Sequence, residues 1–315
     1  MRRVDYWKSL FVGACCIAVF AQSALQPPQA QDWEKAAGGK KAFDVASVKL
    51  DSGPFRPSNF PLVVRDDDAS HLVGDRFSAA YPAFTYITFA YKAGLRFATG
   101  AGAGPADIRK AMQMPDWVMI DRYAIEARAD GISTKDQMRL MMQSLLAERF
   151  RFKAHFEERT FPAFAPELVN SGRTGPKLRP HAEGVPCDEE PAKVDFSKLF
   201  PPVCGGLAYF MMPNRVEKGG SRDTTLADMA EGLPGIGGVD RPMVDRTGLE
   251  GRYDFTVEFA PEPNAVAAAA SDAASDPAAP TFRQALRDQL GLKLESVKAD
   301  IRILVIDHIE RPSGN

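Results

Sequence analysis

The hydrophobic pattern changes its period along the chain. Apolar residues alternate with polar ones in some segments, as in half-buried strands, and recur every three or four residues in others, as in helices. Both patterns occur in each half of the chain, which predicts an α+β fold. Strands are predicted at 43–48, 76–79, 123–127, 150–154, 163–169, 242–244, 252–259, 292–295 and 301–309, and helices at 83–93, 134–149, 225–233 and 281–290. The last two strands are expected to close the chain as a hairpin.

The clearest of these elements is the helix 134–149. Thr134 and Gln137 have the spacing of a capping box, in which each side chain bonds the other residue's backbone N–H. Apolar residues then follow at helical spacing and form one stripe, which predicts a face buried in the core. The stripe comprises Met138, Met141, Met142, Leu145 and Leu146.

The order of elements in the first half recurs in the second. The capping residues Thr134 and Thr281 are 147 residues apart, and the segments that begin at Phe150 and Leu290 are 140 apart. The difference equals about two helical turns, so the second helix is simply shorter. We interpret the chain as two degenerate repeats of helix-strand-helix-strand-strand, forming small antiparallel or mixed sheets with helices on one face. Chance similarity between two ordinary α+β segments is the alternative.

The N-terminus has the composition of a secretory signal. Basic residues in the first eight positions precede an apolar run of about 12 residues, and small residues follow. Residues 1–30 are therefore predicted to be a signal peptide and 31–42 a tether, which makes the protein periplasmic or extracellular. A bilayer span needs about 20 apolar residues, so a membrane helix is the weaker interpretation, and no span is expected after cleavage. A lipid anchor at Cys15 is a further, weaker alternative.

The mature chain is predicted to contain two α+β units, 43–180 and 207–315, the second with a flexible insert at 261–280. Residues 181–206 connect them and contain Cys187 and Cys204. Two cysteines in an exported chain most simply form one disulfide. A metal or redox pair is the alternative, but the spacing is far from C-x-x-C.

Composition excludes several classes of protein. The 315 residues are 45% hydrophobic and 25% charged, as in globular proteins rather than collagen-like or disordered ones. The formal net charge of −2 shows no basic excess, so a nucleic-acid partner is not expected.

Seven distinctive motifs occur in order along the chain, at 43–49, 115–117, 145–150, 175–178, 245–255, 290–296 and 305–313. Together they resemble a large family of secreted soil-bacterial proteins of the Acidobacteria type, described only as a domain of unknown function. The resemblance covers about residues 43–313. It implies no catalytic residues, although some members carry the domain after a membrane-embedded sensor metallopeptidase. The helix-strand-strand units are also similar to small interaction domains of secretins and TonB-dependent receptors.

Candidate chemistry is sparse. No zinc-type histidine spacing, serine-hydrolase elbow or dinucleotide-binding fingerprint occurs, so no catalytic, cofactor or metal site is predicted. Three residues stand out as weak candidates. Asp307 and His308 are adjacent in the last strand and could form an acid/base or ligand site, and Trp117 could stack on a sugar. The structural alternatives are a carboxylate bonded to a turn, a histidine near a strand end, and a packing anchor.

These observations favour a non-enzymatic binding module of the cell envelope or extracellular space. Its expected partner is an envelope or extracellular protein or polymer. One alternative is a hydrolase of envelope or environmental polymers. The other, implied by the family resemblance, is a detached sensor partner of a membrane metallopeptidase.

Overall fold

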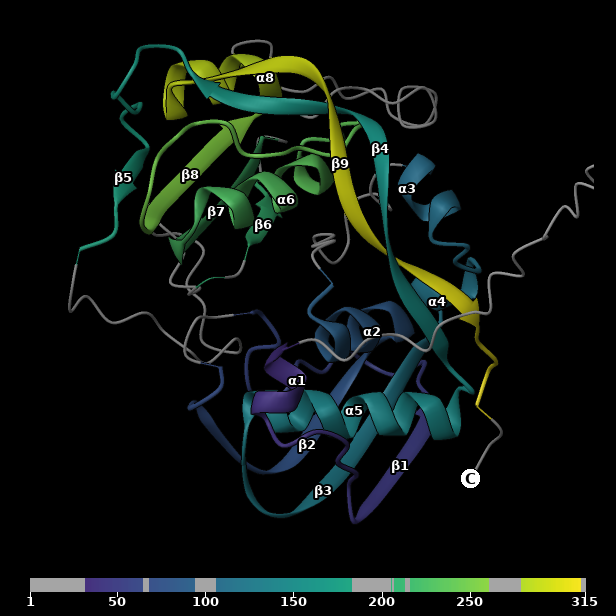
Figure 1. Ribbon diagram of the computed structural model, residues 1–315. Helices are drawn as coiled ribbons and strands as arrows, with labels where there is room; N and C mark the ends of the chain where they lie inside the picture. Colours follow the sequence, from purple (N-terminus) through teal and green to yellow (C-terminus); the bar gives the residue numbers. More distant parts are fainter. Residues whose placement is uncertain are drawn as a thin grey trace, which may run out of the picture.

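The chain forms two α+β units joined by a long two-stranded ribbon (Figure 1). The structure is a computed structural model. Both units combine helices with open antiparallel sheets, so the predicted α+β class is confirmed. The structure describes residues 32–64, 68–93, 106–182, 205, 207–212, 216–260 and 279–312.

The first unit contains a three-stranded sheet of order β1-β3-β2. The helices α2 and α5 pack against each other and against this sheet. The segment between β1 and β2 lies along the outer edge of β2, where Arg56 and Ala80 form an isolated antiparallel β-bridge. The elements are α1 (Asp32–Ala36), β1 (Val45–Leu50), β2 (Leu72–Pro82), α2 (Ala83–Tyr91), α3 (Ala106–Ala111), α4 (Trp117–Ile120), β3 (Arg122–Thr134) and α5 (Lys135–Arg149).

The second unit contains a four-stranded sheet of order β5-β8-β7-β6. Its last helix begins as an α-helix and continues as one π-helical turn, η2. The elements are β5 (Leu178–Pro180), β6 (Ala208–Met211), β7 (Glu217–Thr224), α6 (Leu226–Ile236), β8 (Tyr253–Phe259), α8 (Phe282–Ala285) and η2 (Leu286–Leu290).

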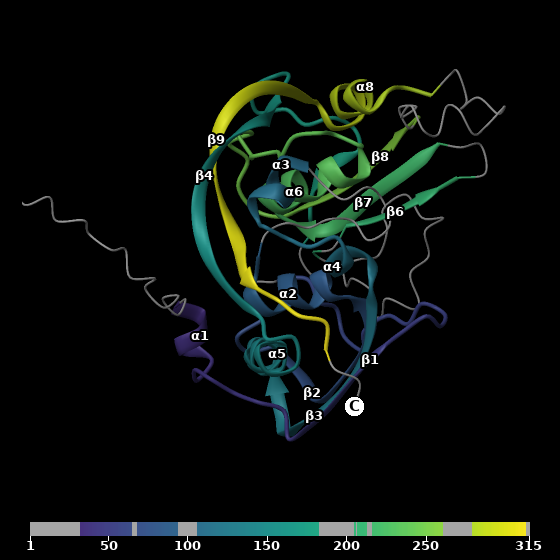
Figure 2. The ribbon, with the colours of Figure 1, turned by 90° about the vertical axis from the view of Figure 1, so that its right-hand side faces the viewer.

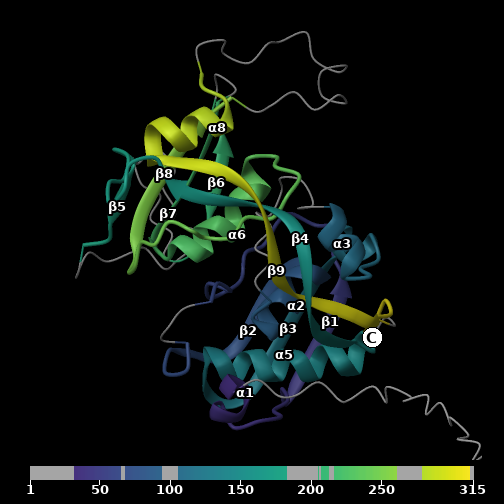
Figure 3. The same cartoon turned by 45° about the horizontal axis from the view of Figure 1, so that its top comes forward.

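The ribbon consists of β4 (Lys153–Leu168) and β9 (Leu292–His308), paired antiparallel along their whole length. It bows along one side of both units (Figure 2), with α5 near one end and α8 near the other (Figure 3). The sequence predicted two strands within each of these segments and a C-terminal hairpin. Both expectations are wrong, because each strand runs unbroken from one unit to the other and finds its partner in the other half of the chain.

The predicted repeat is present, with this long strand in place of the last two short ones. In the first unit Val48 pairs with Ile125, and in the second Leu178 pairs with Phe255. Each residue of the second pair lies 130 positions after its counterpart in the first. The next backbone hydrogen bond is matched as well. Asp51 N–H donates to the Arg122 carbonyl at 2.8 Å, and His181 N–H donates to the Arg252 carbonyl at 2.8 Å.

The ribbon relates the two repeats by an approximate twofold axis. The sequence offset between β4 and β9 is 140 residues, which makes Thr160 and Asp300 equivalent positions. These two residues are also direct partners in the ladder. A twofold axis exchanges equivalent residues, so a pair of equivalent residues that face each other in the ladder must lie on that axis. Each repeat therefore extends its last strand across the axis toward the other repeat.

The strands of the ribbon join the two hydrophobic cores. The core of the first unit includes Ile303, Leu304, Val305 and Ile306 from β9, although 301–309 was expected in the second unit. Phe164 of β4 belongs to the core of the second unit. The sequence boundary at residue 180 therefore does not separate the two cores.

The helix starts are as predicted. Thr134 and Thr281 each accept a hydrogen bond from the third helical residue, and each helix has a complete capping box. Met138 and Met142 of the α5 stripe are fully buried. The stripe is therefore a core face, as its spacing indicated.

Replacing Thr134 by alanine is expected to lower the free energy of unfolding by about 1 kcal/mol. The variant leaves the Gln137 N–H at the start of α5 without its acceptor. Urea denaturation of the purified chain measures the loss. Thr134→Ser keeps the acceptor oxygen and should retain most of the stability, so equal losses in both variants would contradict the capping role.

Candidate functional site

Trp117 lies where α4 meets the first residues of β3. Its ring packs edge-on against Tyr123 with 6.3 Å between centroids. The guanidinium of Arg311 lies over the Trp117 ring at 5.0 Å and bonds the Asp121 carboxylate at 2.8 Å. Trp117 is therefore a half-buried contact between α4, β3 and the C-terminal segment, which agrees with the packing alternative.

The environment of Tyr123 is apolar and weakly charged. Burial raises the pKa of its phenol, the nearby Asp121 carboxylate adds to the rise, and Arg311 opposes it. Beneath it, the buried Tyr86 hydroxyl donates to the Tyr123 carbonyl at 2.6 Å. Burial raises the pKa of Tyr86 too, so both phenols remain neutral at physiological pH.

Large apolar side chains remain exposed around this aromatic contact. Leu50, Phe55 and Ile120 are 70%, 56% and 72% exposed. Leu50 and Tyr81 lie on either side of Tyr123 in the sheet register, and the Phe55 ring contacts Tyr81 at 5.3 Å. Ile120 is one helical turn from Trp117 on α4. We call this surface the apolar rim: Leu50, Phe55, Tyr81, Trp117 and Ile120.

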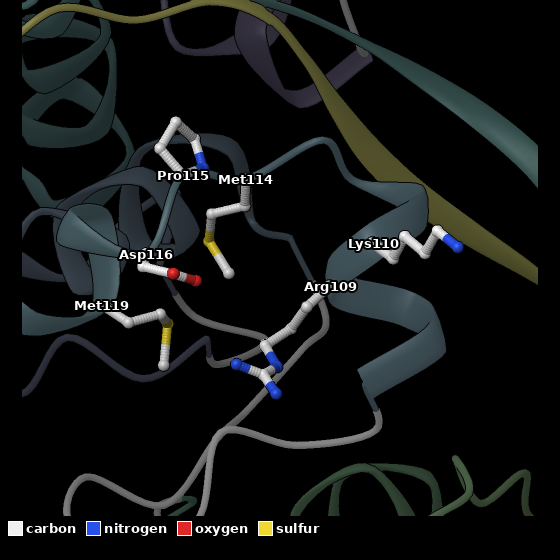
Figure 4. A pocket seen from close by; sticks show the side chains of 6 residues that line it. All are labelled: Arg109, Lys110, Met114, Pro115, Asp116 and Met119. Atoms are coloured by element: carbon white, nitrogen blue, oxygen red, sulfur yellow. The ribbon is translucent and has the colours of Figure 1, made fainter.

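A cavity of about 210 Å³ lies between α3 and α4, beside the rim. Met114, Pro115 and Met119 give it apolar walls, and Arg109 and Asp116 supply charges of opposite sign (Figure 4). The third charged lining residue, Lys110, points away from the other side chains. Pro115, Asp116 and Trp117 form one of the motifs of the family resemblance, so the cavity is built around that motif.

Among the described residues, the side chains of Arg109 and Asp116 have no partner for their charges. The Nε atom of Arg109 is buried without a hydrogen-bond partner. Asp116 occupies the N-cap position of α4, yet its backbone is helical and its carboxylate forms no capping bond. Within the part of the chain that the structure describes, neither residue has an ion pair. The cavity can therefore offer both charges to a bound molecule.

Asp307 and His308 do not form a pair. Asp307 is the extra residue of a β-bulge in β9, opposite the junction of Lys153 and Ala154. Its carboxylate bonds Nδ1 of His155 at 3.0 Å, on the neighbouring strand rather than on a turn. His308 bonds Glu310 instead, at 2.8 Å. The two neighbouring side chains therefore form separate contacts, Asp307 with His155 and His308 with Glu310.

Sequence reasoning missed a second aspartate–histidine pair in the other unit. Nδ1 of His181 lies 2.6 Å from Asp254, and both side chains are mostly buried. Asp254 also accepts the Asp223 N–H and lies 3.6 Å from Arg222. Such a pair orients an imidazole, but among the described residues no hydroxyl or thiol bonds to it. Seventy-three residues separate the two partners in sequence, so no local motif signals them.

Several features predicted from the sequence lie outside the residues that the structure describes. Cys187 and Cys204, the predicted disulfide, lie outside the described residues, as do the signal peptide and most of the insert 261–280. No group of three or more potential metal ligands occurs in the ranges that the structure describes. None of the helices described there is long and apolar enough to cross a membrane.

Comparison with known proteins identifies a family for this chain but no individual relative. No curated protein and no solved structure matches it. Residues 87–309, which include α3, α4, the cavity and the whole ribbon, match a family described as protein of unknown function, DUF3738. Because the match spans more than half of the chain, the chain belongs to the DUF3738 family.

Proposed function

We propose that this chain is an exported, non-enzymatic binding module that recognises a partner polypeptide of the cell envelope or extracellular space. The apolar rim is the proposed contact surface. The observation that carries the proposal is the exposure of Leu50, Phe55 and Ile120 around one aromatic contact. Contiguous exposed apolar side chains typically mark an interaction site.

The chemistry of the rim favours a polypeptide over a sugar polymer. Arg311 already lies over one face of the Trp117 ring and Tyr123 packs edge-on against it, which disfavours sugar stacking. Aliphatic side chains make up the most exposed part of the rim. Aliphatic and aromatic side chains with a flanking arginine are typical of the buried centre of a protein interface. The secretory signal and the Cys187–Cys204 disulfide remain predictions from the sequence. In this proposal they are the reason for placing the protein in the cell envelope or extracellular space.

Site-specific photo-crosslinking tests the proposed contact. A photo-crosslinking amino acid replaces either Ile120, in the rim, or Ile132, which is equally exposed at 72% but lies near the other end of β3. The full chain is expressed in the source cell and irradiated. We expect one envelope protein to be linked at position 120 and not at 132. The N-terminus of the purified chain, read in the same experiment, should begin after the signal segment.

The purified partner then allows a direct measurement of affinity. Ile120→Glu places a charge in the contact and should weaken binding at least tenfold, whereas Ile132→Glu should have little effect. Identical crosslinks at both positions, or equal loss of affinity in both variants, would refute the rim as the contact surface.

A further inference from the structure

We infer that the cavity between α3 and α4 is a binding site for a small zwitterion with an apolar side group, such as an apolar α-amino acid. The site is distinct from the contact with the partner polypeptide proposed above. Its basis is the juxtaposition of Arg109, Asp116 and the two methionines in one cavity (Figure 4).

The first step concerns the positive charge. A guanidinium presents its N–H groups as a fork that matches the two oxygens of a carboxylate. The Arg109 Nε–H is buried without a partner, and an unsatisfied buried donor is costly. A ligand carboxylate in the cavity would satisfy Nε together with a terminal nitrogen of the same side chain.

The second step concerns the negative charge. The Asp116 carboxylate lines the same cavity but forms no capping bond, and the ion pairs of the described residues include none between Asp116 and Arg109. An anion alone would be repelled by Asp116, and a cation alone by Arg109. A molecule that carries an ammonium group beside its carboxylate complements both, so the two unpaired charges select a zwitterion.

The third step concerns size and shape. The volume of about 210 Å³ lies below the roughly 300–1,000 Å³ of cavities for drug-sized ligands, which indicates a smaller molecule. The thioether side chains of Met114 and Met119 adapt their shape to apolar groups. An aliphatic side chain would lie against them while its charged end meets Arg109 and Asp116.

Methyl NMR of the purified full chain tests this site. With ¹³C-labelled methionine methyl groups, Met114 and Met119 are assigned by substituting each with leucine. Leucine is titrated against N-acetyl-leucine, which lacks the ammonium, leucinamide, which lacks the carboxylate, and glycine, which lacks the side chain. We expect saturable shifts of the Met114 and Met119 methyl groups with leucine, and at least tenfold weaker binding of the other three.

Matched variants separate this site from general charge effects. Arg109→Gln and Asp116→Asn should each weaken leucine binding at least tenfold, since each removes one charge-assisted contact. Lys110→Gln removes an equal charge from the adjacent residue, whose side chain points away from those of Arg109 and Asp116, and should weaken leucine binding much less than Arg109→Gln. Because neither Arg109 nor Asp116 has an ion pair among the described residues, both variants are expected to fold.

Several results would overturn the inference. These are no saturable shift below about 10 mM leucine, shifts confined to other methionines, equal binding of leucine and N-acetyl-leucine, or equal effects of Arg109→Gln and Lys110→Gln. The titration uses purified protein and small molecules only. Failure to find a partner polypeptide would therefore leave its outcome unaffected, and the reverse also holds.

Discussion

Replacing Arg139 by methionine is expected to lower the free energy of unfolding by about 3–5 kcal/mol. Arg139 is completely buried in α5, and its guanidinium bonds Asp136 at 2.7 Å and Asp68 at 2.8 Å. Two backbone carbonyls, of Phe89 and Val63, each accept one further N–H group. Methionine fills much of the space but leaves two buried carboxylates and two carbonyls short of a donor.

The effect is large because Arg139 is the centre of a buried ion cluster. Lys135 bonds Asp68 at 3.1 Å, and Lys92 bonds Asp136 at 2.8 Å. Together with Arg139, these residues connect the start of α5 with the end of α2 and with the segment before β2. Removing one member of a buried pair costs more than the pair itself contributes, since the other charge stays desolvated.

Arg149→Met is the matched control, at the end of the same helix. Its guanidinium is 35% exposed and contacts the exposed Glu148 carboxylate at 3.1 Å, where solvent screens the charges, so we expect a loss within about 0.5 kcal/mol. Guanidinium chloride or urea denaturation of both variants compares the two free energies. Similar losses would show that burial of the ion cluster contributes little to the stability of the first unit.

The sequence predicted those parts of the fold whose signals are local. The capping boxes at Thr134 and Thr281 and the methionine stripe of α5 depend on residues within a few positions of one another. The repeat could also be predicted, because equivalent residues keep nearly constant offsets. Short elements without such signals, including α3, α4, β5, β6 and β7, were not predicted as structured.

The ribbon shows why the remaining elements escaped prediction. Pro162 and Pro166 interrupt the pattern of β4, which favoured two short strands. Between them, Phe164 directs its N–H outward to the Pro242 carbonyl, away from β9. Alternate residues of a strand face the same way, so both prolines occupy outward positions where the ladder needs no N–H. This tolerance depends on a partner strand more than 100 residues away.

The candidate site could be predicted only in part. Trp117 was recognised from its motif, but Arg109 and Asp116 approach the same cavity through the packing of two short helices. Neither forms a recognisable spacing pattern with the methionines. The pair of Asp307 and His308 attracted attention because the residues are adjacent, whereas the bulge and the neighbouring strand determine their actual partners.

Two other motifs of the family resemblance meet at a single close contact. Gly175 begins one motif, and Gly291 is the second residue of another. The Gly175 N–H donates to the Leu290 carbonyl at 2.8 Å, and the Lys177 N–H donates to the Gln289 carbonyl at 2.8 Å. The segment after β4 therefore lies directly against the turn between η2 and β9. Gly291 itself has φ +74°, a conformation that glycine adopts without strain.

Gly175→Ala is expected to lower the free energy of unfolding by about 3 kcal/mol, because this contact has no space for a side chain. The new Cβ would approach the Gln289 carbonyl oxygen and the Gly291 nitrogen to within 2.5 Å, and backbone atoms cannot rotate away. Gly172→Ala is the control in the same segment. It has open space around it but φ +70°, so only a conformational cost of about 1 kcal/mol is expected. Chemical denaturation that gave equal losses for both would show that strain in the segment, rather than the close contact, makes glycine necessary at 175.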